Sequence, residues 1–152
     1  MASDTDLKES LQILESFSAL RREIGLIFAQ ELKAMNFGYN QMLVVYYLTK
    51  GPLPMNELSA LSYSDPASTT RTVASLEKAG LVKKSSDPKD SRRSMAELTK
   101  KGQLRAREVL KARTKLGERI GITLPSKDRL QLVSLLEKVR LNLATPDQGV
   151  NQ

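Results

Sequence analysis

The sequence predicts a mainly α-helical fold that carries one small β-ribbon. Three observations lead to this fold class. Apolar residues recur at helical spacing over long stretches near both ends, two short helices flank a tight turn in the middle, and two short strands flank a charged turn after them. The 152 residues, of which 40% are hydrophobic and 27% charged, suffice for a globular protein with its own core.

The first helix is expected to run from Leu7 to Met35. Asp6 is the expected N-cap, and Glu9 three residues later fits the reaching carboxylate of a capping box. A helix of this length would be about 44 Å long, because each residue adds about 1.5 Å. A small domain cannot bury such a helix alone, so the pattern indicates packing against a partner helix.

A second helix is expected to begin with Asn40 as its N-cap and to end at Gly51-Pro52. It is apolar nearly all round, which places it in the core. Tyr46 and Tyr47 on this helix are expected to pack in the core, and the alternative is that they line a ligand pocket. Residues 53–55 could add a short strand.

Two short helices then form a helix-turn-helix pattern. The first covers residues 56–62, and the second opens with Asp65 as N-cap and Pro66 at the first helical position, and closes at Gly80. The start of the second helix of this motif meets base edges in the major groove. Its hydroxyl and guanidinium side chains are the first candidate DNA contacts: Ser68, Thr69, Thr70, Arg71 and Ser75.

A β-ribbon from Leu81 to Thr99 follows directly, with a turn at residues 87–90. Arg92 and Arg93 at its tip cannot be buried, and they suit a narrow, negatively charged DNA minor groove. A charged turn is also ordinary for a wet hairpin tip, but the preceding helix-turn-helix favours binding. The candidate contacts of the ribbon are Lys83, Lys84, Lys89, Asp90, Arg92 and Arg93.

Positive charge is concentrated around this ribbon. Residues 78–107 carry ten basic and three acidic side chains, a net charge of +7 that equals the net charge of the whole chain. Charge localised in this way indicates a polyanionic partner, foremost double-stranded DNA.

The remaining segments are helical. Thr99 is expected to cap a helix that Gly121 to Pro125 interrupts, and Ser126 to cap a last, leucine-rich helix. The tail from Thr145 onward is expected to be frayed and flexible.

Composition excludes several classes of function. The chain contains no cysteine and no histidine, which removes disulfides, thiolate nucleophiles, histidine bases and nearly all zinc sites. No motif of an enzyme appears, so we expect neither catalysis nor a metal or cofactor. No apolar run is long enough to span a membrane and no signal peptide is evident, so the expected location is the cytoplasm.

Three motifs resemble the MarR family of winged helix-turn-helix transcriptional regulators: STTRTVASLEKAGLV at 68–82, DPKDSRR at 87–93 and ELTKKG at 97–102. The resemblance implies a winged helix-turn-helix core over residues 37–107, which binds DNA. It also implies a homodimer formed by N- and C-terminal helices, residues 1–36 and 108–145, with a flexible tail at 146–152. The expected interface residues are Leu7, Leu11, Leu14, Leu132, Leu136, Val139 and Leu143.

The resemblance further implies a repressor that releases a pseudo-palindromic operator when a small aromatic or anionic effector binds. In the wing, Asp90 would pair with Arg92 and hold it in place. Ser91 departs from the family pattern, which most often has an arginine there. The alternative is a winged-helix module for protein contacts, whose basic ribbon docks an acidic partner.

Overall fold

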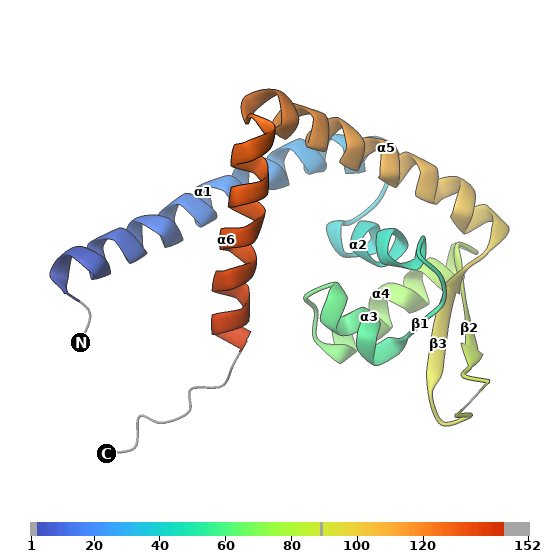
Figure 1. Cartoon of the computed structure of the whole chain (residues 1–152). Coiled ribbons are helices and arrows are strands. Elements are labelled where there is room, and N and C mark those ends of the chain that lie inside the picture. The colour runs from blue at the N-terminus through green and yellow to red at the C-terminus, as the bar shows by residue number, and fades with distance from the viewer. Residues whose placement is uncertain (1–2, 89, 145–152) are drawn as a thin grey trace, which may run out of the picture. The chain divides into compact units, whose positions relative to one another are not determined.

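Six helices and three short strands make up residues 3–88 and 90–144, the part of the chain that the computed structural model describes (Figure 1). In chain order they are α1 (Asp4–Met35), α2 (Tyr39–Leu48), β1 (Leu53–Pro54), α3 (Met55–Leu61), α4 (Pro66–Lys78), β2 (Val82–Ser86), β3 (Ser94–Leu98), α5 (Lys100–Thr123) and α6 (Ser126–Ala144). The predicted mainly helical fold with a small β-ribbon is confirmed. The chain divides into two compact units, residues 1–113 and 114–152.

Helix α1 begins earlier than the sequence predicts, because Ser3 and not Asp6 is its N-cap. The Ser3 hydroxyl accepts the N–H of Asp6 at 3.2 Å, and the Asp6 carboxylate accepts the N–H of Ser3 at 3.0 Å. These two bonds form a capping box. Hydrogen bonding of the Asp6 carboxylate to the side chain and the backbone N–H of Ser3 lowers the pKa of Asp6, because it stabilises the ionised form.

Helix α2 begins at Tyr39, one residue before the predicted N-cap Asn40. Gly38 occupies the N-cap position, and the side-chain oxygen of Gln41 accepts its N–H at 2.8 Å. The helix is buried along most of its length, as expected, but Tyr46 and Tyr47 are only half-buried. The prediction that this pair packs in the core is therefore wrong.

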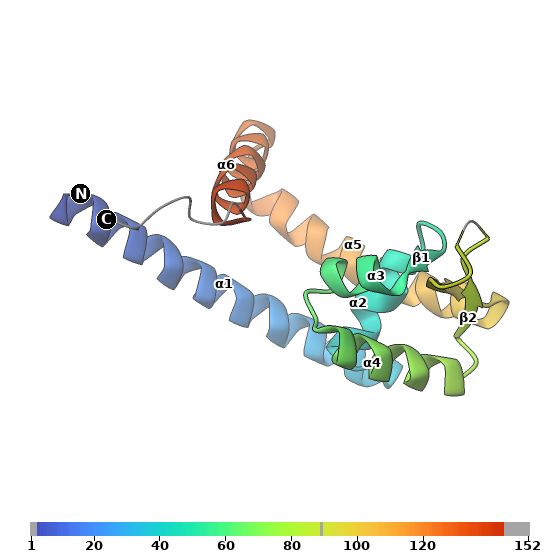
Figure 2. The same cartoon turned by 90° about the horizontal axis from the view of Figure 1, so that it is seen from below.

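The three strands form one antiparallel sheet in the order β1-β3-β2. Val82 pairs with Leu98 at the base of the ribbon and Ser86 with Ser94 at its far end, while Leu53 of β1 pairs with Ala96. Helices α2, α3 and α4 gather beside this sheet, and α4 lies along one edge of the group (Figures 1 and 2). This arrangement is the winged helix-turn-helix that the resemblance implies.

The core of the first unit lies where these short helices meet the sheet and the first turns of α5. Its most deeply buried side chains come from every one of those elements: Met42, Val45, Leu58, Val73, Leu76, Val82, Ala96 and Val109. Burial of this apolar set, at about 25 cal/mol per Å², is the main force that holds α4 and the ribbon in place.

The second unit consists of the end of α5 and all of α6. Helix α5 continues through Gly121 to Thr123, beyond the predicted break, and Ser126 is the first residue of α6 and not its cap. Arg129 closes the turn between them, because its guanidinium donates to the carbonyls of Gly121 at 2.8 Å and Leu124 at 2.6 Å. The predicted flexible tail lies outside the described residues.

None of the helices in the described part of the chain is both long and apolar enough to cross a lipid bilayer. The assignment of residues 1–36 and 108–145 to one dimerisation region stays a prediction.

Candidate nucleic-acid interface

The start of α4 is fixed by the residues that precede it. The Asp65 carboxylate accepts the N–H of Ser68 at 2.8 Å, and Pro66 occupies the first helical turn, so both predictions for this helix start are confirmed. The bonds from Ser68 lower the pKa of Asp65, because they stabilise the carboxylate. The backbone of Tyr63, in the preceding turn, adopts the left-handed conformation with a φ of 52°.

Helix α4 turns one face to the core and the other to solvent. Val73 and Leu76 are fully buried, as predicted, whereas Thr70, Arg71 and Ser75 are exposed and Ser68 is partly exposed. Four of the five predicted contact residues of α4 therefore lie where a DNA duplex could reach them.

Thr69 is the exception among these candidates. Its side chain is 1% exposed, and its hydroxyl has no hydrogen-bond partner within the described part of the chain. It lies four residues before Val73, on the buried face of the helix. The prediction that Thr69 contacts DNA is therefore wrong.

The exposed polar groups of α4 are already ordered by local bonds. The Arg71 guanidinium donates to the Ser68 hydroxyl at 3.0 Å, and the Thr70 hydroxyl donates to the Pro66 carbonyl at 2.8 Å. The Ser75 hydroxyl accepts a bond from Gln41 of α2 at 3.1 Å. These contacts hold the side chains in place and leave guanidinium and hydroxyl groups on the surface.

The turn of the wing is held by main-chain bonds. The N–H of Asp87 donates to the carbonyl of Arg93, and the N–H of Arg93 donates to the carbonyl of Asp90, both at 2.9 Å. The Asp90 carboxylate accepts the N–H of Arg92 at 3.0 Å. Asp90 thus holds the backbone of Arg92, and not its guanidinium as the resemblance implies.

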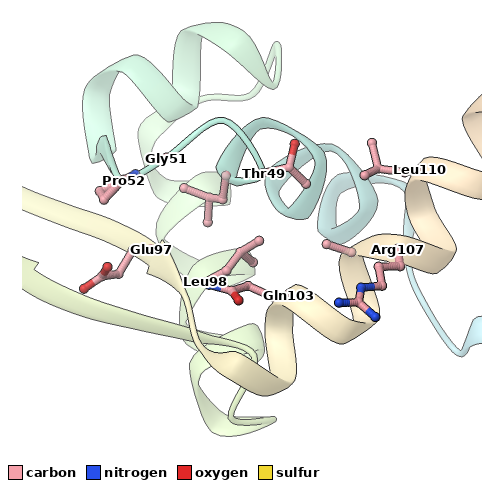
Figure 3. Close-up of a pocket in the computed structure, with 10 residues that line it drawn as sticks. Thr49, Gly51, Pro52, Glu97, Leu98, Gln103, Arg107 and Leu110 are labelled. Carbon is pink, nitrogen blue, oxygen red and sulfur yellow. The ribbon is translucent and has the colours of Figure 1, made fainter.

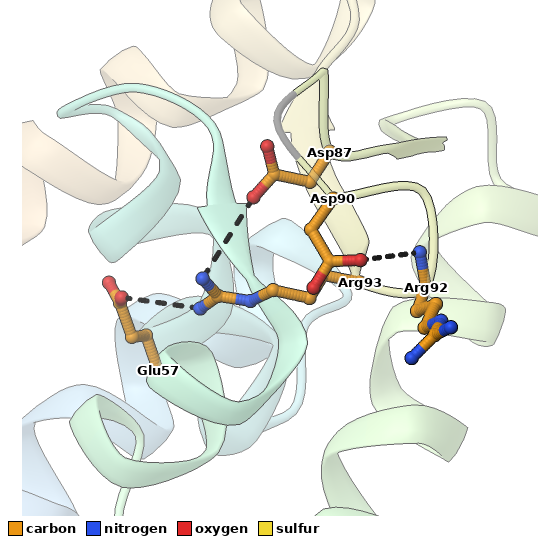
Figure 4. A network of polar contacts seen from close by, with 5 residues as sticks. All are labelled: Glu57, Asp87, Asp90, Arg92 and Arg93. Atoms are coloured by element: carbon orange, nitrogen blue, oxygen red, sulfur yellow. Dashed lines mark hydrogen bonds and ion pairs between the residues drawn. The ribbon is translucent and has the colours of Figure 1, made fainter.

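The two tip arginines have different environments (Figure 4). The Arg93 guanidinium lies 4.0 Å from Asp87 and 4.0 Å from Glu57 of α3, so it ties the wing to the helix-turn-helix. Arg92 points to the other side, and within residues 3–88 and 90–144 its guanidinium has no hydrogen-bond or ion-pair partner. Of the two, Arg92 is the one available to a ligand.

The lysines of the ribbon are also partly engaged. Lys83 pairs with Glu97 across the strands at 2.9 Å, and Lys84 lies 3.7 Å from Glu77 at the end of α4. Both ammonium groups stay accessible to solvent, so the pairs are weak and exchangeable. Lys89, another predicted contact, lies outside the described residues.

The first unit also carries an aromatic surface that the sequence analysis did not predict, because its residues are brought together only by the fold. The rings of Tyr46 and Tyr47 lie 5.1 Å apart, and the Arg113 guanidinium carbon is 3.7 Å from the centre of the Tyr46 ring. The pKa of Tyr47 is raised by burial and by the nearby phenol of Tyr63. We call Tyr46, Tyr47, Tyr63 and Arg113 the tyrosine cluster.

A separate cavity of about 280 Å³ opens between the end of α2, β3 and α5 (Figure 3). The buried side chains of Leu48 and Leu98 line it, together with the exposed side chains of Gln103 and Arg107. This cavity and the tyrosine cluster are two places on the first unit where an apolar surface lies next to an arginine.

Comparison with known proteins relates this arrangement to the MarR family. Residues 40–94, which run from α2 to the start of β3, match the sequence model of the MarR family. The transcriptional regulator PA4135 is 25% identical, with a TM-score of 0.72 over 96% of this chain and 100% of that one. Over residues 40–94 the chain thus matches the MarR family.

Two further solved structures match the fold of this chain over most of their length. AbsC, a MarR family regulator from Streptomyces coelicolor, is 20% identical with a TM-score of 0.76, over 94% of this chain and 97% of that one. BpsR of Bordetella bronchiseptica, whose DNA binding is regulated by 6-hydroxynicotinic acid, is 20% identical with a TM-score of 0.73. The match covers 85% of this chain and 98% of that one. The comparison with curated proteins finds no match.

MarR family members are transcriptional regulators and not enzymes, and the match over residues 40–94 supports a DNA-binding regulator. The helix-turn-helix and β2 of the wing lie within the matched residues, whereas β3 lies beyond them except for Ser94.

Proposed function

We propose that this protein is a ligand-responsive repressor that binds a pseudo-palindromic operator as a homodimer. Helix α4 enters the major groove and reads bases with Thr70 and Arg71, while Ser68, Ser75, Lys83, Lys84 and Lys89 contact phosphates or neighbouring bases. Arg92 enters the flanking minor groove. The observation that carries the proposal is the Arg92 guanidinium, which has no partner among residues 3–88 and 90–144 and is held at the wing tip through its backbone.

Exposed leucines support the homodimer. On α1, Leu7, Leu11 and Leu14 are each at least half exposed, and none of the side chains of α6 is buried, including Leu132, Leu136, Val139 and Leu143. A groove of about 720 Å³ along α1, lined by Phe17, Leu20 and Ile24, adds to this apolar surface. A second copy of the chain is the occupant that would remove these side chains from water.

DNA binding is tested by selecting duplexes from a randomised pool and measuring their affinity by fluorescence anisotropy at several salt concentrations. We expect the enriched duplex to bind about 10³-fold tighter than a scrambled one. Equal, weak binding to both duplexes would contradict a sequence-specific regulator. It would favour the alternative, in which the basic ribbon docks an acidic protein.

The role of Arg92 is tested on the enriched duplex. Arg92→Ala should weaken binding by about 1–3 kcal/mol, the scale of one specific base contact. Arg22→Ala is a charge-matched control, because Arg22 lies on α1 and pairs with Glu23. An affinity of Arg92→Ala equal to that of the control would rule out the minor-groove contact.

The effector we propose is an aromatic carboxylate that binds at the tyrosine cluster. Its ring would stack on Tyr46 and Tyr47, and its carboxylate would pair with Arg113. The ligand of BpsR, a hydroxylated aromatic acid, supports this class. A panel of such acids should release the enriched duplex from wild-type protein and from Arg107→Met, but not from Arg113→Met. Release lost only in Arg107→Met would instead assign the effector to the cavity of Figure 3.

A further inference from the structure

The C-terminal end of α4 is held by the first residues of α5. Helix α4 ends at Lys78, and the next three carbonyls, of Ala79, Gly80 and Leu81, lie past its last turn. All three are occupied from α5 or the residue before it. The Lys101 ammonium donates to Ala79 at 2.9 Å, the Thr99 hydroxyl donates to Gly80 at 2.7 Å, and the Thr99 N–H donates to Leu81 at 3.0 Å.

Thr99 joins the ends of two helices through one hydroxyl group. Its oxygen donates a proton to the Gly80 carbonyl and at the same time accepts the N–H of Gly102 in the first turn of α5, at 3.0 Å. The same atom therefore closes α4 and caps α5. A shift of either helix end would break one of these bonds.

Close packing adds to the hydrogen bonds. A Cβ atom placed on Gly102 would lie 1.9 Å from the Leu81 carbonyl oxygen, so only glycine lets the two segments approach this closely. The aliphatic stem of Lys101 lies against Gly80, and its charge faces the negative end of the α4 dipole. We call this contact between residues 79–81 and 99–102 the helix-end contact.

We propose that Thr99 and Lys101 are positioning residues for sequence-specific DNA recognition, because they fix the tilt of α4 from its far end. The inference rests on the proposed role of α4 in the major groove. Base contacts made by the exposed residues of α4 require a defined helix position, whereas attraction to phosphates does not. Loss of the helix-end contact should therefore reduce specific binding and leave nonspecific binding nearly unchanged.

The experiment measures affinity for the enriched and the scrambled duplex at several salt concentrations. In Thr99→Val and in Lys101→Met, the ratio of the two affinities should fall roughly three- to tenfold, the equivalent of one net hydrogen bond. Thr99→Ser keeps the hydroxyl and should retain the wild-type ratio. Lys100→Met removes the same charge next to Lys101 from an exposed side chain, and should also retain the ratio.

Two controls separate positioning from other effects. If Lys101 contacts a phosphate itself, Lys101→Met will weaken both duplexes alike and reduce the salt slope by about one, which would overturn the proposal. Val109→Ala removes buried volume from α5 outside the helix-end contact. It therefore controls for a general loss of stability of the fold. An equal fall of the affinity ratio in Val109→Ala would also overturn it.

The affinities of the wild-type protein distinguish a failure of the proposed function from a failure of the positioning role. If wild type does not discriminate between the duplexes, the proposed function fails. If wild type discriminates and both Thr99→Val and Lys101→Met discriminate equally well, the function stands and the positioning role fails.

Discussion

Single positions in the first unit limit what its helices can contact. Thr69 and Thr70 are neighbours with the same side chain, but one hydroxyl is enclosed without a partner within the described part of the chain and the other is exposed. Gly102 has no side chain at all, and this absence allows the helix-end contact. Each position leads to a measurable prediction.

Thr69→Val should stabilise the protein by about 1 kcal/mol, because it replaces a buried hydroxyl that has no partner among the described residues with a methyl group of the same shape. Urea unfolding measures the change in stability. Affinity for the enriched duplex should not change. A loss of affinity would mean that the Thr69 hydroxyl reaches the DNA after all.

Gly102→Ala should destabilise the protein by about 1–3 kcal/mol, because the new methyl group meets the Leu81 carbonyl and not a movable side chain. Gly117→Ala in the same helix is the matched control. Nothing lies within 4 Å of a Cβ at that position, so alanine should stabilise α5 by about 0.5–1 kcal/mol. Equal effects of the two variants in thermal unfolding would contradict the close approach.

Among the elements, α4 was the easiest to predict and the ribbon tip the hardest. Asp65, Pro66 and Gly80 each act on the backbone next to them, so the helix bounds follow from local chemistry. The burial of Thr69 was also readable, because it precedes Val73 and Leu76 by four and seven residues on one helical face. The contact from Arg93 to Glu57 joins residues far apart in the chain, and no local pattern indicates it.

The N-cap of α4 should make stability depend on pH. The pKa of Asp65 is lowered in the folded chain, so its contribution is complete above the ordinary carboxyl pKa near 4 and is lost as the pH falls through the folded value. Asp65→Asn keeps a capping oxygen that does not titrate. Wild type should therefore unfold at a higher urea concentration than this variant near neutral pH, and the difference should vanish in acid. A difference independent of pH would contradict the charged cap.

At the scale of the whole molecule, the fold of the first unit follows from sequence patterns and the assembly does not. Apolar spacing predicted the long α1 and the leucine-rich α6, and both leave large apolar side chains exposed. The pattern indicates that a partner covers them, but neither leucine spacing nor exposure tells which helix lies against which. The helix-end contact could not be predicted from the sequence either, because Thr99 and Lys101 occupy positions that are ordinary for the start of a helix.

Leu136→Asp should convert the proposed dimer into monomers, because it places a charge within the apolar surface of α6. Light scattering measures the mass, and circular dichroism verifies that the chain is still helical. Lys138→Asp on the same helix is the control for a new acidic side chain. A folded Leu136→Asp dimer as stable as the control would place the interface elsewhere.

The tyrosine cluster also determines how this protein can be observed. The chain contains four tyrosines, three weakly emitting phenylalanines and no tryptophan, so tyrosine dominates its near-ultraviolet emission. Three of those four rings belong to the cluster, and two of them lie 5.1 Å apart. An aromatic acid stacked on these rings would quench that emission directly. The unlabelled protein thus carries its own optical reporter at the proposed effector site. DNA contains no tyrosine, so it adds no tyrosine emission to the signal.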